Sequence, residues 1–210
     1  MKRWIIVAIA AITLVVAVKR SSAQVQETVF NLTPQQKFLS CFAQPGYTPT
    51  AQIIVQRGTD NDVLILRAQH LRPNLGFDLF TIQNSNLLAD GQINPYFINF
   101  GLAWYQSDLT ADSNGNVDIA IKTILLDQIF GFDPAVNLLP TNTFHVGFWF
   151  DNPHDAAACG FNPSKPTPFN GQHQAGPNAM ISLPDATTDL GPLCTAPIKQ
   201  GTGFACNINQ

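Results

Sequence analysis

The stretch that decides the predicted fold is 143-TFHVGFWF-150. Apolar side chains recur there at every second position, as Phe144, Val146, Phe148 and Phe150. Successive side chains of a β-strand point to opposite faces, so this row predicts a core strand with one strongly apolar face. Burying one such side chain stabilises a fold by on the order of 1.5–3 kcal/mol, and we therefore expect this strand to be a main source of stability.

Six further segments have the alternation or the short apolar runs of β-strands, and most are separated by turn residues. They are 51–58, 62–71, 76–84, 96–109, 115–126 and 179–184. Little helical periodicity lies between them, and the chain has 15 Pro and 14 Gly. The sequence therefore predicts an all-β fold, an antiparallel β-sandwich with long loops rich in Pro and Gly.

One short helix is predicted near the N-terminus. Thr33 is a suitable N-cap, and Pro34 suits the first helical position. Apolar residues then follow at helical spacing until Pro45 and Gly46 end the run.

Residues 1–23 are predicted to be a signal peptide. Lys2 and Arg3 precede the apolar run 4–18, and small residues stand before the expected cleavage site at Gln24. As a helix this run would reach only about 22 Å, short of the ~30 Å hydrocarbon core of a membrane. We therefore expect a secreted protein, periplasmic or extracellular; the alternative is that the segment is retained as a membrane anchor.

The rest of the chain divides into three parts by its composition. Residues 24–50 are expected to form an N-terminal extension with the short helix, and residues 51–183 the β-sandwich domain. Residues 184–210 have little periodicity and contain two cysteines, so we expect a C-terminal covering segment held by disulfides.

The charge balance excludes two classes of partner. Without the signal peptide, seven basic residues stand against fourteen acidic ones, a net charge of −7. Nucleic acids and anionic lipid surfaces are bound by clustered Lys and Arg, so neither is an expected partner. A glycan or another cell-surface component remains a candidate.

All four cysteines lie in the exported part of the chain, which predicts two disulfides. Three pairings are open, and we favour Cys159 with Cys194 and Cys41 with Cys206. The first pair would fasten the long loop after the main strand, and the second would join the two ends. No two cysteines have C-x-x-C spacing, so metal binding by thiolates is not expected.

Three of the four histidines, His145, His154 and His173, lie close together in the sequence. Imidazoles with a carboxylate such as Asp151 would suit zinc, copper or manganese. However, none of these histidines has a partner at H-x-H or H-x-x-x-H spacing, so no single element presents two ligands. We therefore predict no metal cofactor, and keep the three histidines as the ligands if a metal is present.

Four residues are predicted to bind a ligand: Trp149, Asp151, His154 and His173. Trp149 lies on the strand face opposite the Phe row, and the other three lie on the long loop 151–176. Loops of this length without regular structure are often functional. An exposed aromatic ring among polar side chains can hold a sugar; the alternative is that Trp149 belongs to the core.

Polar residues alternate between Asp112 and Asp118 in a way that resembles a calcium loop. The Glu that an EF-hand needs at its twelfth position is missing, because Thr123 stands there. Asn114 and Gly115 predict instead the tight turn of a β-hairpin.

No motif indicates catalysis. The sequence contains neither G-x-S-x-G nor H-E-x-x-H, and Glu27 is its only glutamate. We therefore expect no enzyme but a binding or structural module. One alternative is a metal-dependent enzyme that uses the three histidines named above. Another is an assembly subunit that lends the strand 25–30 to a neighbour's sheet.

The runs 62–71 and 142–150, together with a long Pro/Gly/Asn loop before the closing strand, resemble uncharacterised secreted bacterial proteins with an immunoglobulin-like β-sandwich. The resemblance implies an immunoglobulin-like fold and an extracellular location, and it implies no reaction.

Overall fold

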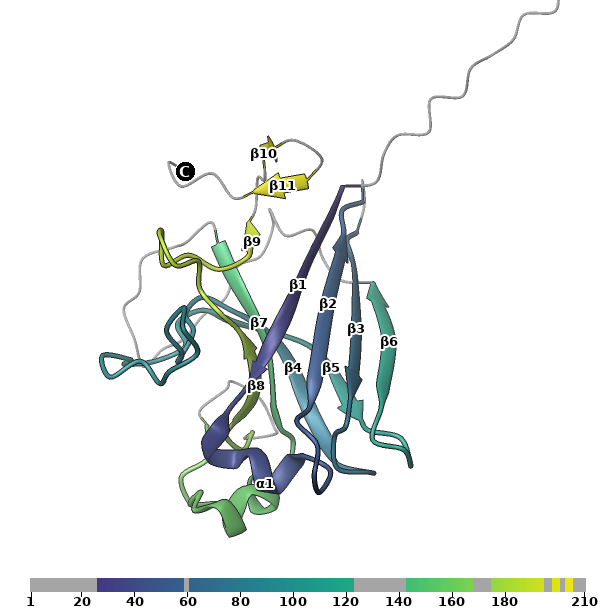
Figure 1. The fold of residues 1–210 in the computed structure, drawn as a ribbon, viewed down its shortest axis with the longest axis vertical. Coiled ribbons are helices and arrows are strands. Elements are labelled where there is room, and N and C mark those ends of the chain that lie inside the picture. Colours follow the sequence, from purple (N-terminus) through teal and green to yellow (C-terminus); the bar gives the residue numbers. More distant parts are fainter. Residues whose placement is uncertain are drawn as a thin grey trace, which may run out of the picture.

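The computed structural model in Figure 1 describes residues 26–58, 61–122, 143–167 and 175–194, together with the backbone of 198–200 and 203–205. The predicted signal peptide lies outside these ranges. Within them, no helix is long and apolar enough to cross a membrane.

The described chain is mostly antiparallel β-sheet, as the sequence predicted. Eight strands are hydrogen-bonded in the order β5-β4-β7-β8-β1-β2-β3-β6, and a short strand, β9, pairs with the start of β7. A separate hairpin consists of β10 and β11. The bounds are β1 Glu27–Pro34, β2 Thr50–Gln56, β3 Val63–Gln69, β4 Gly76–Ile82, β5 Ala103–Thr110, β6 Val117–Lys122, β7 Thr143–Phe150, β8 Asn178–Ser182, β9 Leu193–Cys194, β10 Ile198–Gln200 and β11 Gly203–Ala205.

The sheet curls until its two ends nearly meet. β5 and β6 stand at opposite ends of the strand order, yet only residues 111–116 connect them. Seven peptide steps reach at most roughly 25 Å, whereas the outer two of eight strands laid flat would lie about 34 Å apart. A flat sheet is therefore impossible, and β5 and β6 contact each other. The immunoglobulin-like sandwich of two separate sheets is not confirmed, because these eight strands form one nearly closed sheet.

The link between β5 and β6 is a tight turn, but not the predicted hairpin, because the two strands are hydrogen-bonded to β4 and β3 instead of to each other. One carboxylate oxygen of Asp112 accepts the backbone N–H groups of Asn114 and Asn116, both at 2.8 Å. Gly115 has a φ of 78°, and a Cβ there would collide with the carbonyl oxygen of Leu71. The aspartate therefore organises the backbone of the turn.

All seven predicted strands are present, although the run 96–109 becomes a strand only at Ala103, and residues 123–126 of the run 115–126 lie outside the described residues. The N-terminal segment differs from the expectation, because it contributes β1 to the sheet between β2 and β8. Thr33 and Pro34 end this strand and do not begin the helix. The helix follows as a 3₁₀ turn, η1 (Gln36–Phe38), and one α-helical turn, α1 (Leu39–Phe42).

The inner face of β7 fills the core, as predicted. Phe144, Val146, Phe148 and Phe150 are all buried. The ring of Phe148 packs edge-on against Phe77 of β4, with 5.0 Å between the ring centroids. This row therefore joins β4 and β7 at the centre of the sheet.

The outer face of β7 is also buried. Trp149 is 0% exposed, and it packs edge-on against Phe80 and against Phe100 of the loop 83–102, which joins β4 to β5. Gly147 permits this packing, because a Cβ there would lie 2.8 Å from the carbonyl oxygen of Met180 and 3.0 Å from the Trp149 ring. Loop 83–102 therefore covers β7 from outside.

One disulfide joins Cys41 of α1 to Cys159, the last residue of the 3₁₀ helix η3 (Pro153–Cys159). The predicted pairs Cys159 with Cys194 and Cys41 with Cys206 are therefore wrong. The fold brings α1 beside η3, which spacing along the chain could not reveal. Cys194 is also disulfide-bonded, and Cys206 lies outside the described residues.

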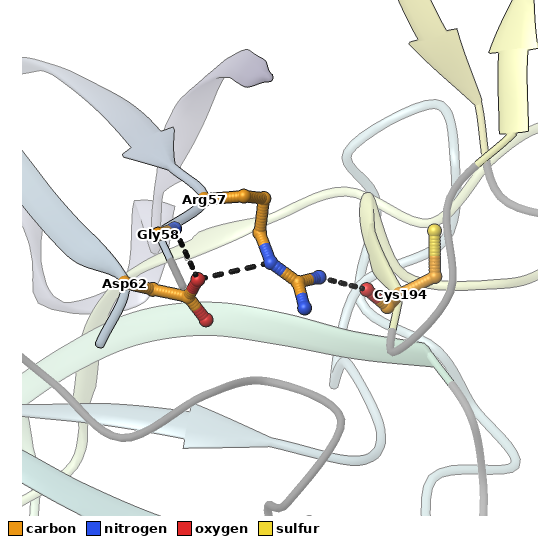
Figure 2. A network of polar contacts seen from close by, with 4 residues as sticks. All are labelled: Arg57, Gly58, Asp62 and Cys194. Atoms are coloured by element: carbon orange, nitrogen blue, oxygen red, sulfur yellow. Dashed lines mark hydrogen bonds and ion pairs between the residues drawn. The ribbon is translucent and has the colours of Figure 1, made fainter. Parts of the chain in front are cut away.

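An ion pair between partly buried Arg57 and buried Asp62 holds β9 to the end of β2 (Figure 2). Arg57 donates from Nε to Asp62 at 2.9 Å and from a terminal nitrogen to the carbonyl oxygen of Cys194 at 3.1 Å. The same Asp62 oxygen accepts the backbone N–H of Gly58. Because a buried charge is costly unless it is paired, we interpret this network as structural.

Replacing Phe148 with Ala tests the role of β7. We expect the free energy of unfolding to fall by about 3–5 kcal/mol in a urea melt, because the change leaves a cavity between β4 and β7. Tyr96→Ala is the control, since that side chain is 86% exposed and its loss should change stability by less than about 0.5 kcal/mol. Similar losses for the two variants would contradict this role.

The disulfide predicts a second stability effect. Cys41 and Cys159 are 118 residues apart, and removing a disulfide from a native domain typically costs about 2–5 kcal/mol. We expect that loss in a urea melt of the double variant Cys41→Ser/Cys159→Ser. A non-reducing digest should yield a peptide that links Cys41 to Cys159, and a Cys159–Cys194 peptide would contradict the structure.

Candidate ligand-binding pocket

The structure separates the residues that the sequence grouped into one site. Trp149 is fully buried and offers no ring face to solvent, so it does not meet the expectation of an exposed aromatic. Asp151 and His154 are exposed beyond the end of β7, and His173 lies outside the described residues. Asn152 accepts the backbone N–H of His154 and so caps η3.

The described histidines do not share a metal site. His145 lies near the start of β7, and five residues of extended strand, about 16 Å, separate it from Phe150. His154 follows beyond that end, in η3, which contacts α1. In the part of the chain that the structure describes, no group of three His, Cys, Asp or Glu side chains could hold a metal ion.

A different site lies against loop 83–102. A pocket of about 220 Å³ opens there, and we call it the His145 pocket after the buried strand residue that lines it. Loop 83–102 supplies most of the lining, and Pro184 and Asp189 contribute from the segment after β8. The lining combines amide side chains (Gln83, Asn84, Asn94, Asn99) with apolar ones (Leu87, Tyr96, Phe97, Ile98).

Loop 83–102 is held in one conformation by its own hydrogen bonds. The backbone N–H of Asn84 donates to the carbonyl of Phe100 at 2.9 Å, and that of Asn94 donates to Asn86 at 3.0 Å. The side-chain oxygen of Asn94 accepts the N–H of Tyr96, and that of Asn99 accepts the N–H of Gly101, both at 2.9 Å. The pocket is therefore shaped before any ligand arrives.

His145 is 2% exposed and neutral. Its Nδ1 lies 3.1 Å from the carbonyl oxygen of Ser182. The Ser182 hydroxyl is also 3.1 Å from Nδ1, and it accepts the N–H of Val146 at 3.2 Å. A carbonyl only accepts, so we assign the proton to Nδ1, and Nε2 keeps its lone pair. Burial lowers the pKa of His145 from 6.5 to about 4, and the bond to Ser182 opposes this shift. Among the described residues, Nε2 has no hydrogen-bond partner, and it is left to act as an acceptor.

The pocket gathers a serine, a histidine and an aspartate, but not in a catalytic arrangement. The hydroxyl of Ser85 accepts the backbone N–H of Leu87 at 3.1 Å, and Nδ1 of His145 contacts a carbonyl instead of a carboxylate. Within the described chain, no hydrogen bond joins Ser85, His145 and Asp189. Nucleophilic catalysis needs those contacts to activate a hydroxyl, and the geometry does not provide them.

Comparison with known proteins finds no family model, no curated protein and no solved structure that matches this chain. Any statement about function must therefore come from the chemistry of the pocket itself.

Sequence reasoning missed this site because it assigned residues 96–102 to a strand. A signal was nevertheless present. Asn94-Pro95 is a turn dipeptide, and Asn99 stands two residues before Gly101. In turns, the side-chain oxygen of an asparagine often accepts the backbone N–H two residues further along the chain. This hydrogen bond forms from Tyr96 to Asn94 and from Gly101 to Asn99.

The neutral state of His145 predicts a pH dependence of stability. The unfolded chain binds a proton at this residue below about pH 6.5, whereas the folded chain does so only below about pH 4. This contribution is therefore complete above pH 6.5 and falls as the pH drops toward 4, by about 3 kcal/mol in total.

Urea melts at pH 7.0 and pH 4.5 would measure this effect. His145→Asn is the matched control, because Asn keeps an N–H for the carbonyl of Ser182 and does not titrate. We expect the wild type to lose about 2–3 kcal/mol more than the variant between the two pH values. Equal losses would show that His145 is not buried in its neutral form.

Proposed function

We propose that this chain is an exported, non-catalytic binding protein whose site is the His145 pocket with the adjoining part of loop 83–102. The observation that carries the proposal is the exposure of large apolar side chains on a rigid loop. Ile93, Tyr96 and Ile98 are 62%, 86% and 87% exposed. Tyr96 and Ile98 both line the pocket, and exposed apolar surface beside a pocket often marks an interaction site.

The loop has the properties of a preformed binding surface. Ordering a flexible loop on binding costs free energy, and this loop is already ordered by its hydrogen bonds. Its base is fixed by the packing of Phe100 on Trp149, with 5.0 Å between the ring centroids. Trp149 therefore supports the site from beneath, and Tyr96 presents the exposed ring that the sequence placed at Trp149.

Export is supported by the chemistry of the cysteines. Cys41, Cys159 and Cys194 are all disulfide-bonded, which is typical of proteins in oxidising compartments. The apolar run 4–18 behind two basic residues is consistent with a secretory signal. Both observations favour a periplasmic or extracellular location.

Two alternatives have less support. A metal-dependent enzyme would need His145 and His154 together, and the length of β7 keeps them apart. Strand donation to a neighbour would use residues 25–30, but Glu27 to Leu32 already pair with β2 of the same chain. That strand is therefore occupied within its own sheet.

Ligand-observed NMR on the full mature chain tests the proposal. The probes are a panel of neutral sugars, sugar acids, amino acids and short peptides. We expect at least one probe to bind, and Tyr96→Ala to weaken that binding at least tenfold. Tyr47→Ala is the matched control, because Tyr47 is also an exposed tyrosine, at 57%, and lies outside the pocket lining. No binding from the whole panel, or equal effects of the two variants, would overturn the proposal.

A further inference from the structure

The atoms that remain unpaired in the His145 pocket indicate the class of its ligand, an inference that rests on the proposed function. Two are acceptors. Nε2 of His145 has no partner among the described residues, and His145 is 2% exposed and lines the pocket. The side-chain nitrogen of Asn84 donates to the carbonyl of Asn99 at 3.3 Å, and the side-chain oxygen has no partner among the described residues.

Two further atoms are donors. The side-chain oxygens of Asn94 and Asn99 accept backbone N–H groups. The amide nitrogen could not accept these N–H groups, so the oxygen and nitrogen of each side chain are assigned by this contact. Their amide nitrogens have no partner in the described chain. The pocket therefore offers a mixed set, with donors at Asn94 and Asn99 and acceptors at His145 and Asn84.

A mixed set discriminates between classes of ligand. A carboxylate or phosphate group only accepts, so it would leave the lone pairs of His145 and Asn84 unmatched. An ammonium group only donates, so it would leave the amide groups of Asn94 and Asn99 unmatched. A hydroxyl does both, and neighbouring hydroxyls on one ring can satisfy donors and acceptors together. A polar group that a ligand shields from water without pairing is unfavourable, so the set favours a ligand that both donates and accepts.

The remaining properties of the pocket agree with a neutral ligand of one ring. Its lining contains no Lys or Arg, and Asp189 is its only acidic residue. Its volume of about 220 Å³ is below the ~300–1,000 Å³ typical of sites for drug-sized molecules. Tyr96 and Ile98 add an apolar surface beside the amides, and a sugar ring has a corresponding C–H face.

We propose that the His145 pocket binds a single unit of a neutral saccharide. One hydroxyl of the sugar donates to Nε2 of His145, others bond to Asn84, Asn94 and Asn99, and its C–H face packs on Tyr96. Burial keeps Nε2 an acceptor at neutral pH, because His145 takes up a proton only below about pH 4. The bond between Nδ1 and the carbonyl of Ser182 orients the ring.

Isothermal titration calorimetry on the full mature chain tests this assignment. The neutral probes are glucose, galactose, mannose and N-acetylglucosamine. Glucuronate and glucosamine are the anionic and cationic probes. We expect at least one neutral sugar to bind, and to bind at least tenfold more tightly than either charged probe. Stronger binding of glucuronate or glucosamine would overturn the ligand class.

Two variants locate the binding. Asn94→Asp keeps the oxygen that accepts the N–H of Tyr96 but removes the donor, and we expect at least a tenfold loss of affinity for the neutral sugar. His145→Asn keeps the bond to Ser182 but removes the buried acceptor, and we expect a loss of similar size. Asn162→Asp is the matched control, because its oxygen accepts the N–H of Ser164 in the same type of turn outside the pocket lining, and affinity should not change.

The outcomes separate this inference from the proposed function. Sugar binding that survives Asn94→Asp would overturn the inference, even if His145→Asn does not fold. If no sugar binds but an amino acid or a peptide binds in a Tyr96-dependent way, the pocket is a binding site for another class of ligand. If nothing binds in either experiment, both proposals fail.

Discussion

Strand β7 is buried on both of its faces, and the rest of the structure depends on how that burial is achieved. Its inner face carries the Phe row, which needs apolar partners from strands on every side. The curl of the sheet supplies them, and the short connection between β5 and β6 makes that curl unavoidable. Its outer face carries His145, Gly147 and Trp149. Loop 83–102 covers this face, with Phe100 packed on Trp149 and several other loop residues lining the pocket beside His145.

This covering explains why a loop has the order of a core element. Phe100 packs on Trp149, while hydrogen bonds close the loop at its base. The apolar residues that do not reach the core, Ile93, Tyr96 and Ile98, remain at the surface. The loop thus has two roles: it buries the outer face of β7 and presents an apolar, amide-rich surface to solvent. The proposed site is a consequence of the way the strand is covered.

His145 illustrates the energetic balance at this site. A buried imidazole is costly unless its polar atoms are paired, and only Nδ1 finds a partner within the described chain. His145 also lines the pocket against loop 83–102. Asn94 and Asn99 are likewise paired at only one atom. The side-chain oxygen of each accepts a backbone N–H of the loop, and the side-chain nitrogen has no partner among the described residues. The side chains that order the loop therefore also line the proposed binding site.

What the sequence determined by itself is local. The period-2 alternation of Phe144 to Phe150 predicted the core strand correctly, and the same signal found six more strands, because alternation between two faces is a property of a few consecutive residues. The cysteine count indicated oxidised cysteines, and the structure shows disulfides at Cys41, Cys159 and Cys194. The sequence offered residues 25–30 as a strand only for a neighbour's sheet and Thr33 and Pro34 as the start of a helix, whereas pairing with β2 and β8 places Glu27–Pro34 in the chain's own sheet.

What only the tertiary structure decided is which distant segments meet. The pairing of Cys41 with Cys159 and the burial of Trp149 against Phe80 and Phe100 both join residues far apart in the chain. Spacing carries no information about such contacts. The pocket belongs to this class, since His145 of β7 and the asparagines of loop 83–102 come together only after β4 and β7 have paired. A sequence pattern can show which residues face one way, but the partner of each face is selected by the packing of the whole chain.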